Sequence, residues 1–357
     1  MSAGGTPAAT GAPSRAAGRA GARLALVLAA GLASVAAALA VAVLAGPHPV
    51  SLDAALAGDG PDRAILLGLR LPRALLGAAV GAALATAGVA LQALLRNALA
   101  EPFVLGVSGG AALGGTAMLV ASAALGSGSA IGGLAASGSA VAIGAAGGAA
   151  ASTALVFALG RVGGRLSPES ALLVGVVFNA FAAGLITVVK VLVAPEQAAQ
   201  LLYWLMGAVG YADAGTLVAG TTLVAVAVAA LVLLSGQLNL LALGDEEAAS
   251  LGVEVGRARG AVFLAASLAT GAAVALAGMV GFVGLIVPHF LRRLFGPDHR
   301  LLVPASALFG AAFLVLADAL ARLAFLPLGS EPPVGALTAL AGGPFFLWLL
   351  RRGERTA

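Results

Sequence analysis

The feature that most constrains this sequence is the stretch from Pro102 to Gly160, which carries no charged residue. A soluble domain uses charged residues for roughly 25% of its sequence, because they cover its apolar core. Here only 10% of the 357 residues are charged and 61% are hydrophobic. The chain cannot build a charged surface of that kind, and we expect it to lie in a lipid bilayer.

The other apolar runs are also continuous, which favours helices over a β-barrel. Barrel strands alternate apolar and polar residues, whereas a transmembrane helix needs about 20 apolar residues in succession. Glycines and serines at 126–133 divide the charge-free stretch into two crossings. The sequence therefore predicts an all-α polytopic membrane protein with about ten transmembrane helices. The runs cover residues 24–45, 74–95, 103–124, 133–160, 170–193, 214–236, 260–280, 283–295, 302–322 and 335–350.

The chain divides into a short tail and one long membrane domain. Residues 1–22 are rich in Gly, Ala, Pro and Ser and have no hydrophobic periodicity, so they are expected to form a disordered cytoplasmic tail. The run that begins at Leu24 is long enough to span the bilayer and lacks a persuasive signal-peptide cleavage site. We therefore expect residues 23–352 to form a single transmembrane domain.

The distribution of basic residues predicts the orientation. If the N-terminus is cytoplasmic and ten crossings follow, fourteen arginines fall on the cytoplasmic side and five basic residues outside. This agrees with the positive-inside rule and predicts that both termini are cytoplasmic. The five outer residues are Arg63, Arg70, Arg73, Lys190 and Arg322.

Several functional classes can be set aside from the residues alone. Cysteine is absent, and the three histidines lie far apart without metal-ligand spacing, so no metal site is expected. The single lysine, Lys190, follows Val189, so the chain has no phosphate-binding loop of the GxxxxGK[ST] type. Such an apolar chain also offers no basic stripe for nucleic acid. Energy for active transport would have to come from another chain.

Asp318 is the acid that lies deepest in a predicted helix, and it leaves two interpretations open. Arg322 follows at i+4 on the same helix face, so the two side chains can neutralise each other. An ion-coupled secondary transporter would instead use a membrane acid as its ion carrier. The other acids lie almost entirely in connections, which favours the ion pair.

The segment Leu238–Gly252 lies between two predicted helices on the cytoplasmic side. It is expected to form two short helices separated near Gly244, and Asp245 to Glu247 favour the N-terminus of the second. Leu243 and Leu251 would be exposed at a cytoplasmic surface. This pattern favours a docking site for a soluble partner over a passive linker.

With these motifs the chain resembles the permease subunits of bacterial ATP-binding-cassette importers for iron siderophores, haem and vitamin B12, the type II importers of the FecCD type. The resemblance runs from about residue 65 to residue 350, with two departures: Ala98 replaces a usual proline and Pro332 a usual leucine. Its motifs are Arg70 to Arg73, Gln92, Arg96 to Pro102, Leu105 to Ala111, Trp204, Gly207, Leu240 to Gly252, Gly281 to His289, Asp318 to Arg322, Glu331 to Gly335 and Gly343 to Phe346.

The resemblance implies a non-catalytic permease in the bacterial cytoplasmic (inner) membrane. It would work as a dimer, formed by two copies or with a similar chain, around a central pathway. Two ATP-binding cassette ATPase subunits would use ATP and Mg²⁺ inside, and a periplasmic or lipid-anchored substrate-binding protein would dock outside. The chain itself would bind no cofactor, and its substrate would be an iron siderophore, haem or a cobalamin.

The resemblance also implies residue roles. Arg70, Arg73 and Arg322 would contact carboxylates of the binding protein, and Asn97 and Leu99 would form the cytoplasmic gate. Asn179, in the fifth helix, would face the pathway or hydrogen-bond to another helix, and both interpretations stay open. ATPase coupling would use residues of the cytoplasmic loop 237–258, namely Leu243, Gly244, Asp245, Glu246, Ala248, Leu251 and Gly252.

Overall fold

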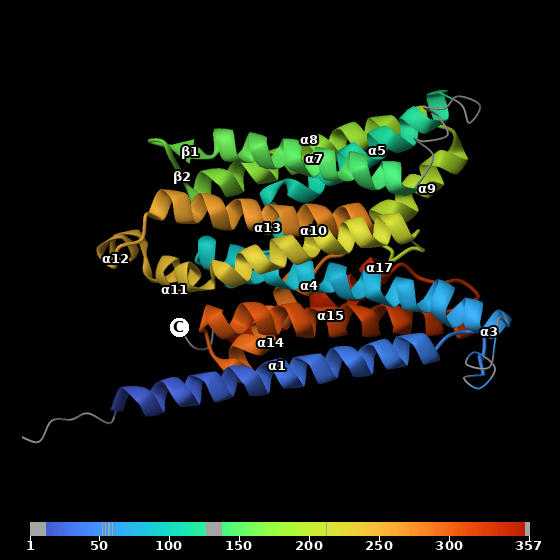
Figure 1. Cartoon of the computed structure of the whole chain (residues 1–357). Helices are drawn as coiled ribbons and strands as arrows, with labels where there is room; N and C mark the ends of the chain where they lie inside the picture. Colours follow the sequence, from blue (N-terminus) through green and yellow to red (C-terminus); the bar gives the residue numbers. More distant parts are fainter. Residues whose placement is uncertain are drawn as a thin grey trace, which may run out of the picture.

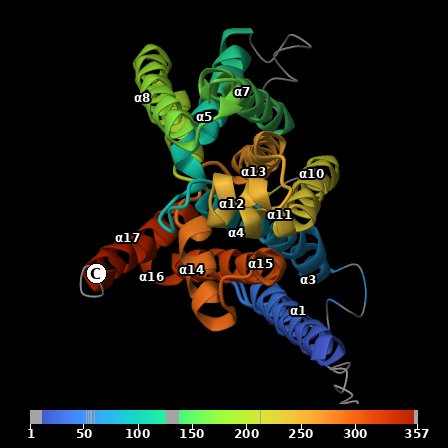
Figure 2. The ribbon, with the colours of Figure 1, turned by 90° about the vertical axis from the view of Figure 1, so that its left-hand side faces the viewer.

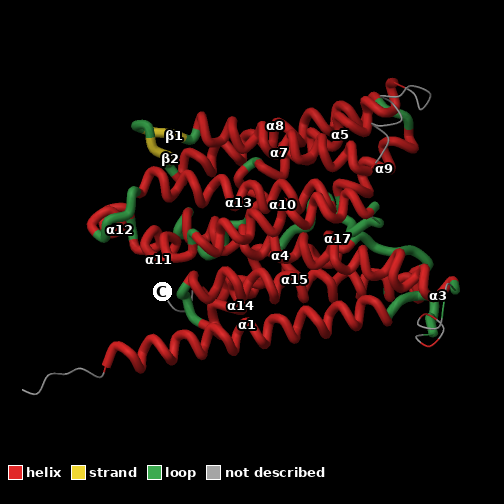
Figure 3. Tube along the Cα trace, viewed as in Figure 1, coloured by secondary structure: helices red, strands yellow, loops and turns green. Residues whose placement is uncertain are grey.

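The computed structural model describes residues 12–51, 53, 55, 58, 60–125, 138–211 and 213–353. These residues form a helical bundle with one small strand pair, β1 (Arg161–Val162) with β2 (Arg165–Leu166) (Figure 3). The long helices are α1 (Ala12–Leu44), α4 (Leu71–Leu94), α5 (Val107–Leu125), α7 (Gly138–Leu159), α8 (Pro168–Leu192), α10 (Ala214–Leu233), α13 (Val255–Ala277), α14 (Val283–Phe295), α15 (His299–Leu323) and α17 (Val334–Gly353). The short helical segments are α3 (Pro61–Arg63), a π-helix (Ala64–Arg70), a 3₁₀-helix (Pro102–Leu105), α9 (Pro195–Leu205), α11 (Ser235–Leu243), α12 (Asp245–Ser250) and α16 (Phe325–Leu328).

Each of the predicted apolar runs overlaps one of these ten helices, and the predicted break at residues 126–133 lies outside the described residues. Among the described residues, seven helices are long and apolar enough to cross a membrane, and Val107–Ala121 and Val334–Trp348 are shorter apolar helices. Helix α14 has 13 residues, which at about 1.5 Å per residue reach only about 20 Å. This length is shorter than the hydrocarbon core of about 30 Å. The crossing at residues 283–295 and the count of ten crossings stay predictions.

Helix α1 begins earlier than its apolar run. It starts at Ala12, so residues 12–22, which we expected to be disordered, are helical, and residues 1–11 lie outside the described part. The segment is rich in alanine and arginine, which favour helix, and Pro13 stands in the first turn, where proline is tolerated. Helix propensity therefore extends the helix beyond the membrane-spanning residues, a signal that hydrophobic periodicity alone does not carry.

Helices α4 and α13 form the centre of the bundle, and Figure 2 shows the others arranged around them. In both, 78% of the most apolar 18-residue window is buried, against 17% in α8 and α10. Glycine makes the closest packing possible, because a Cβ at Gly88 of α4 would overlap the carbonyl oxygen of Gly284 of α14. The peripheral helices present apolar side chains outward, as a bilayer requires.

The bundle has two ends, which we call the α12 end and the α3 end (Figure 1). The α12 end carries α11, α12 and the β1–β2 hairpin, and the beginning of α1 and the end of α17 lie toward it. The α3 end carries α3 and the beginning of α4. Both described ends of the chain thus lie toward one end of the bundle, in agreement with an even number of crossings.

Candidate functional site

At the α12 end, α11 and α12 form the two short helices that the sequence predicts, separated at Gly244. Gly244 has φ +141°, a backbone conformation that favours glycine, whereas a Cβ there would meet only the carboxylate at the end of the flexible Glu247 side chain. Leu243 is 61% exposed and Leu251 59% exposed, as expected for a docking surface. Ala248, in contrast, is fully buried and is therefore part of the support of this surface.

Hydrogen bonds from α11 tie this segment to the start of α15. Asn239 of α11 donates to Asp298 (2.7 Å) and accepts from the backbone N–H of His299 (2.8 Å), which ties α11 to the start of α15. Burial alone would raise the pKa of Asp298, but hydrogen bonds from Asn239 and the Arg300 N–H outweigh it and hold that pKa below its usual range. Gly252, at φ +85°, ends α12 in a left-handed cap.

The predicted gate turn follows α4 at the same end. Asn97 is exposed, and its side-chain oxygen accepts from the backbone N–H of Leu99 (2.9 Å), which closes a local turn. Leu99 is half-buried. Ala98 is exposed. The hydrogen bond from the Leu99 N–H to Asn97 closes the turn although alanine, and not proline, stands at this position.

Two polar side chains that we gave no role anchor this turn to α14. Gln92 donates to the carbonyl oxygen of Gly284 (3.1 Å) and accepts from Arg292 (2.8 Å). Glu101 accepts from the backbone N–H of Phe282, a residue at φ +67° just before α14. Burial raises the pKa of Glu101, and the hydrogen bond from Phe282 opposes part of that rise. The available signal was polar side chains on both sides of the turn within an apolar sequence.

At the α3 end the structure brings together a charged cluster around Asp318. Arg73 donates to both oxygens of this buried carboxylate (Nη2 at 2.8 Å and Nε at 3.1 Å) and also to Glu331. The Nε atom of Arg322 lies 3.3 Å from Asp318 Oδ2, so the predicted ion pair one helical turn apart is present. With two guanidinium partners, Asp318 has the surroundings of a structural ion pair, not those of a free ion carrier.

Arg70 and Arg322 bind the end of α1. Arg70 donates to the carbonyl oxygens of Val43 and Leu44 (both 3.0 Å), and Arg322 to that of Ala42 (2.7 Å). These are carbonyls that a helix C-terminus leaves without partners. Arg70, Arg73 and Arg322 are only 5–6% exposed. Within the chain, backbone carbonyls and Asp318 accept hydrogen bonds from these guanidiniums, whereas the Nε atom of Arg322 makes no hydrogen bond. The contact of the three arginines with a binding protein stays a prediction.

Asn179 of α8 makes the interhelical hydrogen bonds that we considered. It donates to the carbonyl oxygen of Phe103 (2.7 Å) and accepts from the backbone N–H of Gly109 (3.1 Å). It also lines a cavity with Ser108 and Met279, among others. The interhelical interpretation is therefore present in the structure, and the position of Asn179 on the pathway stays a prediction.

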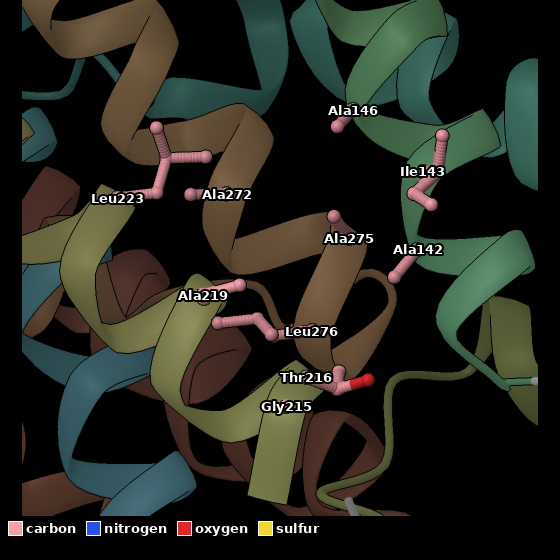
Figure 4. A pocket seen from close by; sticks show the side chains of 11 residues that line it. Ala142, Ile143, Ala146, Gly215, Thr216, Ala219, Leu223, Ala272, Ala275 and Leu276 are labelled. Atoms are coloured by element: carbon pink, nitrogen blue, oxygen red, sulfur yellow. The ribbon is translucent and has the colours of Figure 1, made fainter. Parts of the chain in front are cut away.

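A separate apolar cavity lies between α7, α10 and α13 (Figure 4). Its side chains are alanines, leucines and Ile143, with the hydroxyl of Thr216 at one end. None of the residues that line it belongs to the turn or to the charged cluster. Among the described residues, no group of three or more His, Asp or Glu is arranged to hold a metal ion.

The comparisons with known proteins agree with this geometry. The FecCD transport family model matches residues 24–352. The chain is 42% identical to the hemin transport system permease protein HmuU of Yersinia pestis, over 81% of this chain and 83% of that protein. It is 39% identical to the cobalamin import system permease protein BtuC of Halobacterium salinarum, over 88% and 82%.

A solved structure supports the same assignment. It describes an inward-facing conformation of a metal-chelate type ABC transporter, and the alignment covers 92% of this chain and 99% of that one. The TM-score is 0.77 at 28% sequence identity. The family match over almost the whole chain, the relatives at about 40% identity and the shared fold lead to one conclusion: the chain belongs to the FecCD transport family.

Proposed function

We propose that this chain is the permease subunit of an ATP-driven importer in the bacterial inner membrane, with an iron siderophore, haem or a cobalamin as substrate. The observation that carries the proposal is the similarity to haem and cobalamin permeases over more than four fifths of the chain. The chain would be non-catalytic, and separate ATPase subunits would hydrolyse ATP. An ion-coupled secondary transporter is the alternative, and the two arginines on Asp318 count against it.

The subunit composition tests this proposal. The tagged protein is purified from its own host in mild detergent, and the bound chains are identified by mass spectrometry. We expect an ATPase with a phosphate-binding loop, and a second permease copy or a similar chain. Uptake of cyanocobalamin, haemin or ferric citrate into vesicles that contain this chain alone, driven by an ion gradient, would contradict the proposal.

We propose that the α11–α12 segment is the ATPase-coupling element. Its two exposed leucines lie on either side of α12, beside the acidic Asp245 and Glu246. Leu251→Asp is expected to uncouple ATP hydrolysis from uptake in the reconstituted complex, and Gly244→Leu to do the same by displacing Glu247. Val162→Asp in the hairpin is the matched control, because Val162 is 62% exposed at the same end but outside the segment.

We propose that the turn with Asn97 and Leu99 is the cytoplasmic gate. The chain contains no cysteine, so Leu99→Cys introduces a unique thiol. Cross-linking of two copies through this thiol is expected to trap a closed state and stop uptake. If the thiols of two copies never react with a short cross-linker, in the presence or absence of ATP, the turn is only a connection.

We propose that the substrate-binding protein docks at the α3 end, with Arg73 as the direct contact. Its partner Glu331 is about one-third exposed, so a carboxylate of the binding protein can take the place of Glu331. Arg70 and Arg322 would contribute by fixing the end of α1. Glu331→Gln is then expected to tighten docking and Arg73→Gln to weaken it, and both effects should shrink at high salt. Equal affinities of the parent, Glu331→Gln and Arg73→Gln for the binding protein at low salt would exclude this role.

A further inference from the structure

A single carboxylate joins three elements at the α12 end. Asp245, the first residue of α12, is paired with Arg96 of the turn after α4 and with Arg259 in the first turns of α13 (2.5 Å for Arg259). The side chain of Arg259 is 11% exposed, whereas those of Arg96 and Asp245 are a little under half exposed. A polar cavity lies beside them, and Ser167 and Glu169 at the start of α8 share its lining.

The backbone at Arg96 is the second observation. Helix α4 ends in a cap in which the Arg96 N–H donates to Ala93 O (3.3 Å) and the Asn97 N–H to Gln92 O (3.1 Å). This cap places Arg96 at φ +47°, a left-handed conformation in which glycine is ordinarily favoured. An arginine at this position imposes strain that a glycine would remove, which indicates that its side chain has a use.

The surroundings of the turn define how it can move. Gln92 and Glu101, on either side of it, are fastened to the α14 region through Gly284 O and the Phe282 N–H. Arg96 lies between these two anchors, immediately before Asn97, and reaches across to α12. Arg96 is thus the contact through which a displacement of α12 would reach the turn.

We infer that Arg96 and Arg259 are positioning residues that link the coupling segment to the gate turn through Asp245. Arg259 holds Asp245 against α13, and Arg96 transmits the movement of α12 to Asn97 and Leu99. This inference rests on the proposed function of the segment and of the turn.

The test uses the complete complex of permease, ATPase and binding protein in liposomes, in a Leu99→Cys background. Two quantities are measured: ATP hydrolysis, and the change in cross-linking between the two copies when ATP is added. Arg96→Gly removes the side chain and also relieves the left-handed backbone. We expect its melting temperature to equal or exceed that of the parent, ATP hydrolysis to continue, and the ATP-dependent change in cross-linking to fall about five-fold or more.

Two further variants distinguish a link between the segment and the turn from a merely structural role of Arg96. Arg257→Gln removes an exposed arginine of the same helix α13, paired only locally with Glu254, and should change neither quantity. The triple exchange Arg96→Asp, Asp245→Arg and Arg259→Asp reverses all three charges and keeps both ion pairs, so it should restore most of the ATP-dependent change. Failure of the exchange to restore it would overturn the link.

The outcomes also distinguish this inference from the proposed function. If Leu251→Asp abolishes the ATP-dependent change but Arg96→Gly does not, the segment couples by another route and the link is refuted. If neither variant alters it, the segment is not the coupling element, and both proposals fail. If the parent never cross-links at Leu99→Cys, the turn is not the gate, and the link to it is refuted.

Discussion

Removal of the Asp318 carboxylate is expected to be the most destabilising charge change in the chain. Asp318 is 2% exposed and serves two buried guanidiniums, those of Arg73 and Arg322. Loss of one partner from a buried ion pair typically costs 3–5 kcal/mol, because the remaining charge stays in a low-dielectric environment. In Asp318→Asn, Arg73 keeps Glu331 and Arg322 keeps the carbonyl oxygen of Ala42. We therefore expect a loss at the lower limit, about 3 kcal/mol.

The assay is thermal unfolding of the purified permease in detergent. With a shift of about 2 °C per kcal/mol for a chain of this size, Asp318→Asn should melt about 6 °C below the parent. Glu331→Gln is the matched control. It removes the partly exposed carboxylate of the same cluster and leaves Asp318 in place, so it should cost about 1 kcal/mol, or about 2 °C.

A second variant tests the cause of the loss. Asp318→Asn combined with Arg73→Met removes one of the two guanidiniums that lost the Asp318 carboxylate, and it should be more stable than Asp318→Asn alone. Equal melting temperatures of Asp318→Asn and Glu331→Gln would refute the reasoning, because the buried pair would then be worth no more than the exposed one.

Two further predictions concern the packing and the anchor of the gate turn. Gly88→Ala should lower the yield of folded protein and reduce the free energy of unfolding by about 1–3 kcal/mol or more, because the new Cβ overlaps Gly284 O. Gly184→Ala on α8 is the control: its Cβ meets no atom within 4 Å, so thermal unfolding should show little change. Burial raises the pKa of Glu101 above 4.5, so the folded state keeps this proton to a higher pH than the unfolded state does. Stability should therefore fall as pH rises from about 4.5 through the raised pKa, and melting curves of Glu101→Gln should lack this part of the pH dependence.

The features that the sequence predicts correctly are those that depend on local pattern. The ten apolar runs overlap helices because a continuous apolar segment in a bilayer must satisfy its backbone hydrogen bonds within the segment. The break at Gly244 was predictable because an acidic run starts a helix directly after a glycine. The exposure of Leu243 and Leu251 follows, since both flank the six-residue helix α12.

The features that it misses depend on partners far along the chain. The acceptors of Arg70 are backbone carbonyls of α1, and the Asp318 partner Arg73 lies 245 residues away in the sequence. A carbonyl oxygen carries no signature in the sequence, so these arginines looked unpaired. The same limit applies to Arg96 and Asp245, which are 149 residues apart and meet only because the end of α4 lies beside α12.

The pairing of charges suggests what the partner at the α12 end must offer. At the α3 end, Arg73 and Asp318 are paired within the chain, and at the α12 end Asp245 is paired as well. The apolar side chains of Leu243 and Leu251, in contrast, are exposed next to Glu246 and Glu247, which lie in the first turn of α12. Burial of the two leucines against a partner provides affinity but does not fix the orientation of that partner. The nearby carboxylates can fix the orientation by pairing with basic residues of the partner. A partner that fits this segment should therefore present an apolar groove with basic residues along its rim, and replacing those basic residues should slow docking most strongly at low salt.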